Sequence, residues 1–237
     1  MEPRTALRPS PVLYAQALLS HLEDLRASME PELQQHAPIQ LHAYAAQLAI
    51  NEVALSGDPA VKEQSTGLTS PNLSRLKHLH ASLQAIKSWL DVFFALPLAS
   101  FMGVPTCHIL QLRHCMGLLF VLSTLDDASW STEDVRADVD ILTVIDRMSD
   151  KFRQVARASG IDANGEPQGE DVWTRAAGRT QGLRQLWATK LAAQPATQPE
   201  SSYTAVTPVT NANGALFANW SDLDFSNFDW INSTFLS

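Results

Sequence analysis

The sequence predicts an all-α protein, and three observations support that prediction. Apolar residues recur at spacings of three and four along most of residues 10–190, which is the period of a helix face. Serine followed by proline, a preferred pair at a helix start, occurs at Ser10–Pro11 and at Ser70–Pro71. No alternating β-branched run between residues 10 and 190 qualifies as a strand. We therefore expect about five to seven helices in one α-helical domain.

The first two predicted helices lie before Gly57. One follows Ser10–Pro11 and places apolar residues at helical spacing; these are Leu18, Leu22, Leu25 and Met29. The segment EPELQQHAP then interrupts the helical pattern. The second helix, IQLHAYAAQLAINEVAL, is nearly uncharged, which predicts that it is largely buried.

The helix predicted after Ser70–Pro71 carries the most regular apolar pattern in the chain. Two heptad series run along it, Leu76, Leu83 and Leu90 in the first and Leu79, Ile86 and Phe93 in the second. Nearly three heptads fit either an ordinary packed helix or a seam that pairs with a partner helix. The packed helix is the main interpretation, and the partner seam is the alternative.

Three further helices are expected before residue 191. An apolar break with proline, ALPLASFMGVP, precedes a strongly apolar helix, TCHILQLRHCMGLLFVLSTL. Ser131 then has the position of an N-cap, with Asp134 three residues on and Trp130 placed to contact Val135. That start predicts one continuous helix ending before Gly160. A last amphipathic helix is expected over residues 171–190, although Gly178 and Gly182 weaken its pattern.

Charge and composition divide the chain. The formal net charge is −8, yet all 17 Lys and Arg residues lie at or before Lys190. The charged residues among the last 47 are all acidic; they are Glu200, Asp222, Asp224 and Asp229. We predict a disordered N-terminus at 1–9, the helical domain at 10–190, a disordered linker at 191–215 and an acidic, aromatic tail at 216–237.

Several classes of function fit the sequence poorly. The net negative charge argues against direct DNA contact and against binding to an anionic membrane. No run approaches the ~20 apolar residues of a membrane span, and the N-terminus lacks the apolar core of a signal peptide. Cys107 and Cys115 are eight residues apart on one predicted helix, so we expect buried free thiols in a reducing compartment.

No catalytic or metal-binding pattern stands out either. The sequence has no glycine-rich phosphate loop and no G-x-S-x-G elbow. Asp126 and Asp127 lack a third carboxylate one turn on, because Trp130 occupies that place. Neighbouring Cys and His residues at 107, 108, 114 and 115 are spread over about 10 Å of helix axis, too far for one zinc ion to join a pair spaced by seven residues. We expect no enzyme activity, no catalytic residue and no cofactor.

The tail is the region whose composition most favours binding. Asp side chains between isolated aromatic rings keep such a segment soluble, so the rings stay available to a partner with a shallow apolar groove and a basic rim. The predicted coactivator-binding residues are Trp220, Asp222, Leu223, Asp224, Phe225, Phe228, Asp229 and Trp230. The alternative is that residues 216–237 dock on their own domain.

The order of these helices resembles the regulatory middle and C-terminal region of fungal zinc-binuclear-cluster transcription factors. The resemblance rests on YAQALLSHLEDLRASMEPELQQ, on LHAYAAQLAINEVAL and most of all on residues 89–155, where a VR…VDIL…IDRM helix follows QLRHCMGLLFVLSTLDD and a Trp. It covers residues 10–159 and the tail. It implies an α-helical regulatory domain, a role in transcription in the nucleus and transcriptional coactivators as partners.

The sequence departs from that family at its DNA-binding element. The family holds two zinc ions with six cysteines, whereas only Cys107 and Cys115 occur here. We therefore carry over no zinc and no DNA-binding residue, and we expect either a truncated member or a regulator that does not itself contact DNA. A homologous DNA-binding regulator, or a second copy of this chain, is a possible further partner. The alternative function is a helical adaptor or inhibitory subunit that uses the heptad seam.

Overall fold

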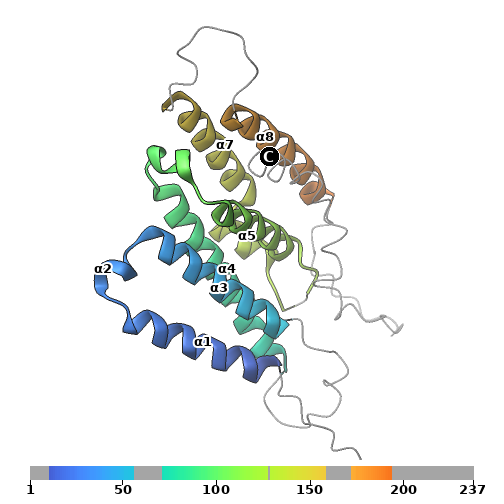
Figure 1. Cartoon of the computed structure of the whole chain (residues 1–237). Helices are drawn as coiled ribbons and strands as arrows, with labels where there is room; N and C mark the ends of the chain where they lie inside the picture. The colour runs from blue at the N-terminus through green and yellow to red at the C-terminus, as the bar shows by residue number, and fades with distance from the viewer. Residues whose placement is uncertain (1–10, 56–70, 128, 159–171, 194–237) are drawn as a thin grey trace, which may run out of the picture. The chain divides into compact units, whose positions relative to one another are not determined.

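The computed structural model describes residues 11–55, 71–127, 129–158 and 172–193, and these residues form helices and no strand (Figure 1). This confirms the all-α prediction for the described part of the chain. Six of its α-helices have 18 or more residues, and two short ones bring the described number to eight, one above the expected range. The predicted disordered N-terminus at 1–9, the tail at 216–237 and residues 194–215 of the predicted linker lie outside the described residues, whereas the last helix, α8 (Val172–Ala192), extends two residues into the predicted linker at 191–215.

The chain divides into two compact units, residues 1–93 and residues 94–237. The predicted boundaries at residues 10, 190 and 216 separate helical from disordered or acidic segments, and they stay predictions.

The first unit begins with α1 (Pro11–Ser28), α2 (Pro31–Gln34) and α3 (Ala37–Leu55). Helix α1 starts at the predicted proline and packs against α3, with the Arg26 guanidinium 5.5 Å from the centre of the Tyr44 ring. The segment expected to interrupt the helices contains the four-residue α2, because Pro31 suits a first helical position. In α3, Leu41 and Leu48 are fully buried.

Helix α4 (Pro71–Ala95) completes the first unit and extends two residues beyond it. A buried polar pair ties it to α3, since the Nδ1 atom of His78 lies 2.8 Å from the Oδ1 atom of Asn51. The Asn51 amide nitrogen donates to the carbonyl of Gln47 at 2.8 Å, so its Oδ1 atom accepts from His78. Burial lowers the pKa of His78, which favours the neutral ring.

The second unit contains the 3₁₀ helix η2 (Leu98–Gly103) and the helices α5 (Thr106–Thr124), α6 (Thr132–Asp138), α7 (Ile141–Ala158) and α8 (Val172–Ala192). Helices α7 and α8 pack along each other, η2 packs on α7, and α5 contacts α6 and α7. The apolar break that was predicted before α5 thus contains η2.

The prediction of one continuous helix after Ser131 is wrong. The Ser131 side chain does cap a helix, accepting from the backbone N–H of Asp134 at 3.1 Å, but that helix, α6, ends at Asp138. Asp140 then starts α7, because its carboxylate accepts from the backbone N–H groups of Leu142 and Thr143 at 3.2 and 3.1 Å. An aspartate that satisfies these N–H groups is a strong N-cap, and it separates two helices whose apolar residues read as one series.

None of the helices that the structure describes is both long enough and apolar enough to cross a lipid bilayer.

Candidate functional site

The predicted coactivator-binding residues lie outside the described residues. They are Trp220, Asp222, Leu223, Asp224, Phe225, Phe228, Asp229 and Trp230, all within the range 194–237. Their role stays a prediction. Among the described residues, the helices of the second unit are the part of the chain nearest to the tail in sequence, and candidate functional groups are expected there.

The heptad seam of α4 is mostly buried in the chain. Leu79, Leu83, Ile86, Leu90 and Phe93 are each at most 4% exposed, and Leu76 is half-buried. The Phe93 ring also stacks on Trp89, with ring centres 5.0 Å apart. Side chains already covered in this way offer little surface to a partner helix, so their burial favours the packed-helix interpretation. Pairing with a partner remains untested.

A lysine of α7 caps the C-terminal end of α4. The Lys151 ammonium donates to the carbonyl oxygens of Phe94 at 3.1 Å and Leu96 at 2.7 Å, and it lies 5.3 Å from the centre of the Phe101 ring. The last carbonyls of a helix lack intrahelical partners and carry partial negative charge, so a cation stabilises them. Partial burial lowers the pKa of Lys151.

Arg147, one helical turn before Lys151, holds the same segment. Its guanidinium lies 4.3 Å from the centre of the Phe94 ring, a cation–π distance. Two cationic side chains of α7 therefore contact the segment that leads from α4 into η2. No local pattern predicts this contact, because Lys151 and Phe94 are 57 residues apart.

The α7–α8 interface is built around Trp173. This ring is 4% exposed and lies 5.6 Å from the Phe152 ring and 6.0 Å from the Phe101 ring, centre to centre. The buried Ser149 hydroxyl donates to the carbonyl of Ala177 at 3.2 Å, which fixes the two helices at their crossing. Aromatic burial of this kind makes α8 an integral part of the unit.

The predicted Trp130 junction is also a structural element. The Trp130 indole N–H donates to the carbonyl of Leu122 at 2.9 Å, and Arg136 donates to the carbonyl of Ser123 at 2.9 Å. Both groups therefore satisfy carbonyls at the end of α5. The Asp127 carboxylate accepts from the backbone N–H and the hydroxyl of Ser129 at 2.9 and 2.6 Å, which is a turn contact.

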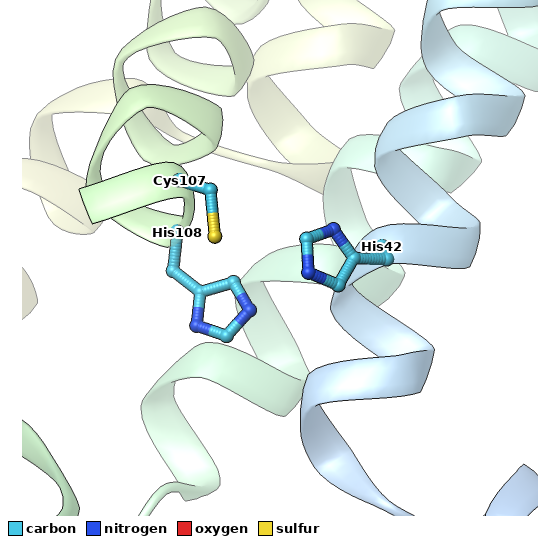
Figure 2. A group of neighbouring side chains, drawn as sticks. All are labelled: His42, Cys107 and His108. Carbon is cyan, nitrogen blue, oxygen red and sulfur yellow. The ribbon is translucent and has the colours of Figure 1, made fainter. Parts of the chain in front are cut away.

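The cysteines and histidines at the start of α5 face different surroundings. Cys107 is exposed, which corrects the expectation that both thiols are buried, while Cys115 is buried and both are free of disulfides. Cys107 and the buried His108 project from consecutive positions of the first turn, as Figure 2 shows. His42, drawn in the same figure, belongs to α3 of the first unit. Among the described residues of the second unit, Cys107 and His108 supply two neighbouring ligands here, fewer than the three or four of a zinc site.

The basic surface of α8 is the feature that sequence reasoning missed. This helix holds four bases, Arg175, Arg179, Arg184 and Lys190, and no acid. Arg184 pairs with Asp146 of α7 at 2.8 Å. The side chains of Arg175 and Arg179 reach the exposed surface of the helix. Residues 172–192 carry bases and no acid, which could have indicated this surface. The negative net charge of the whole chain obscured it.

Comparison with known proteins places the second unit in a family. The family model of the ATEG07667 C-terminal domain matches residues 98–237, from the first residue of η2 through the tail. No solved structure matches the chain.

Two curated relatives extend the similarity into the first unit. The transcription factor opdL of Penicillium oxalicum is 30% identical over 212 residues, which are 89% of this chain and 36% of that protein. A transcription factor of Aspergillus terreus is 30% identical over 169 residues, which are 68% of this chain and 28% of that protein. The chain thus spans about a third of the length of these relatives.

Proposed function

The chain belongs to the C-terminal domain family of fungal transcription factors that ATEG07667 represents, and from that premise we propose that it regulates transcription through a helical body and a coactivator-binding tail. Two relatives named transcription factors support the regulatory role. The composition of residues 216–237 supports the role of the tail, and it is the observation that carries the proposal.

The physical argument for the tail rests on its mixture of rings and acids. Trp220, Phe225, Phe228 and Trp230 supply apolar anchors, while Asp222, Asp224 and Asp229 favour approach to a basic rim. Anchors separated by polar residues bind a shallow apolar groove without a rigid fit. This kind of contact is weak and fast, as exchange among coactivators requires.

Under this proposal the chain works in the nucleus and catalyses no reaction. Its partners are transcriptional coactivators, and DNA is reached through a homologous DNA-binding regulator or a second copy rather than by residues of this chain. No zinc or other cofactor is required of the residues present.

A reporter assay tests the tail directly. Residues 200–237 are fused to a heterologous DNA-binding domain, and we expect reporter activation that F225A/F228A/W230A abolishes, because the apolar anchors are lost. The matched control, S226A/N227A, changes neighbouring polar residues and should retain activation. Absence of activation from the intact fusion would refute the proposal.

The alternative, a helical adaptor that pairs through the α4 seam, makes a different prediction. It requires binding to a partner that depends on Leu83 and Leu90 and is independent of the tail. Both side chains are buried, so L83A/L90A must first be shown to stay folded by circular dichroism. Partner capture that survives removal of the tail anchors but not this double change would favour the adaptor.

A further inference from the structure

Charge is distributed in opposite ways on α8 and on the tail. Helix α8 carries four bases without an acid, and its neighbour α7 carries four bases with two acids, so the pair has a net charge of +6. The last 47 residues carry four acids without a base. Two regions of one chain that lie close in sequence are therefore electrostatically complementary.

The geometry of α8 turns part of this charge outward. Its apolar side is buried in the second unit through Trp173, Leu183 and Trp187. Arg175 and Arg179 are exposed one turn apart on the other side, and Lys190 follows them at a spacing that keeps it on the same side. We call these three residues the basic face of α8.

The basic face also has room for aromatic rings. Gly178 and Gly182 lie between its charged residues, and a Cβ atom placed on either would meet no atom of the described residues within 4 Å beyond its chain neighbours and its own helix backbone. The backbone is therefore open there, and the half-buried Leu186 adds apolar surface beside it. A segment that combines rings with carboxylates fits this combination of open backbone, apolar surface and cations.

We propose that residues 216–237 of the chain's own tail dock on the basic face of α8 and there compete with coactivators. The docking itself involves this chain alone. Its consequence, that docking hides the tail from coactivators, rests on the proposed function. Asp222, Asp224 and Asp229 meet Arg175, Arg179 and Lys190, and the tail rings pack over the exposed backbone between the cations.

The tail is long enough to reach, and its tether favours capture. The 23 residues from 193 to 215 extend to at most about 75–80 Å, whereas the 21 residues of α8 span roughly 32 Å. Binding within one chain acts at an effective concentration of order millimolar, so weak charge contacts suffice. A separate acidic protein of equal affinity would displace the tail only above that concentration.

One competitor for the basic face lies in the chain itself. The segment between α7 and α8 carries Asp162, Glu166, Glu170 and Asp171. These carboxylates precede α8 in the sequence, closer to Arg175 than to Lys190, so Arg175 is the residue of the basic face for which they are the nearest competitors. If they hold the arginines in place of the tail, tail cleavage by chymotrypsin will be unchanged in R175E/R179E.

Limited chymotrypsin digestion of the full chain measures whether the tail rings are covered. Cleavage after Phe217, Trp220, Phe225, Phe228 and Trp230 is followed by mass spectrometry, with rates normalised to a synthetic peptide of the same sequence. We expect R175E/R179E to raise tail cleavage on the order of five- to tenfold, because two attractions become repulsions. Salt at about 0.5 M should raise cleavage in the wild-type chain and have little effect in the variant.

Two further variants make the result specific. K77E removes an exposed base from α4 of the first unit and should leave tail cleavage unchanged. R175E/R179E combined with D222R/D224R restores opposite charges and should restore slow cleavage. Unchanged cleavage in R175E/R179E, or an equal rise in K77E, would overturn the docking. No coactivator is present, so this result is independent of the reporter assay.

Discussion

The two units of the chain bury their interiors differently. In the second unit, α7 and α8 enclose Trp173 against Phe152 and Phe101. In the first unit, α1 buries only Ala15, and a hydrogen-bonded pair, Asn51 and His78, lies inside. The family model covers the helices of the second unit alone. The two units thus differ in what joins their long helices: aromatic rings meet between α7 and α8, whereas a buried polar pair joins α3 and α4.

The largest effect should come from removing the central ring of the second unit. W173A deletes a side chain that contacts two other aromatic rings, and we expect a loss of about 3–5 kcal/mol in the free energy of unfolding of that unit. Hydrogen exchange should accelerate in α7 and α8. Y14A is the matched control, because Tyr14 is 53% exposed on α1 and should cost about 0.5 kcal/mol or less. Equal acceleration in α1 and α3 would mean that the two interiors unfold together.

An intermediate effect is expected from the polar pair of the first unit. N51A leaves the buried Nδ1–H group of His78 without its acceptor, which should destabilise the first unit by about 1–3 kcal/mol. Urea titration monitored by hydrogen exchange in α3 and α4 measures the loss. Q16A, an exposed change on α1, is the control. Loss of protection in α8 of equal size would contradict the assignment of this pair to one unit.

The same pair gives the first unit a pH dependence. Because burial lowers the pKa of His78 from 6.5, the unfolded chain takes up this proton first as the pH falls. The stabilising contribution is therefore present above pH 6.5 and is lost as the pH falls through the folded pKa. The free energy of unfolding should be lower at pH 5.5 than at pH 7.5 in the wild-type chain, and H78N should reduce that difference.

The smallest effect tests the exposed side of α8. G178A places a methyl group where no atom lies within 4 Å, and alanine favours the helix, so stability should rise by about 0.5–1 kcal/mol. The midpoint of thermal unfolding of α8, followed by hydrogen exchange, measures the gain. G182A should behave alike, since its surroundings are equally open. This gain is expected in a chain that lacks residues 216–237, and a loss of stability confined to the full chain would mean that the docked tail covers this side of α8. A loss in both chains would contradict the open surroundings of the two glycines.

The sequence predicted the elements that rest on local chemistry. Ser10–Pro11 and Ser70–Pro71 anticipated the starts of α1 and α4, and the Ser131 cap formed as expected. The break between α6 and α7 was missed because Val135, Val139 and Leu142 continue one helical series, and the local N-cap signal of Asp140 was overlooked within that series. Apolar periodicity reports the buried face, and a cap can interrupt the helix without changing that face.

The candidate site was less predictable than the fold. Its tail residues were selected by composition, and they lie outside the described residues. The Lys151 contact with Phe94 could not be anticipated, because no local pattern links two residues that only tertiary packing brings together. The basic face of α8 had a signal in its charges, but its exposure depends on which side Trp173 and Trp187 bury.

The capping of α4 by Lys151 has a consequence for synthesis on the ribosome. The carbonyls of Phe94 and Leu96 receive their donor from a residue made 57 and 55 positions later. At about 5–20 residues per second, Lys151 is added roughly 3–11 s after Phe94. Until Lys151 is made, these two carbonyls at the end of α4 must take their hydrogen bonds from water. Rare codons between positions 94 and 151 would lengthen the period in which this end is open to chaperones.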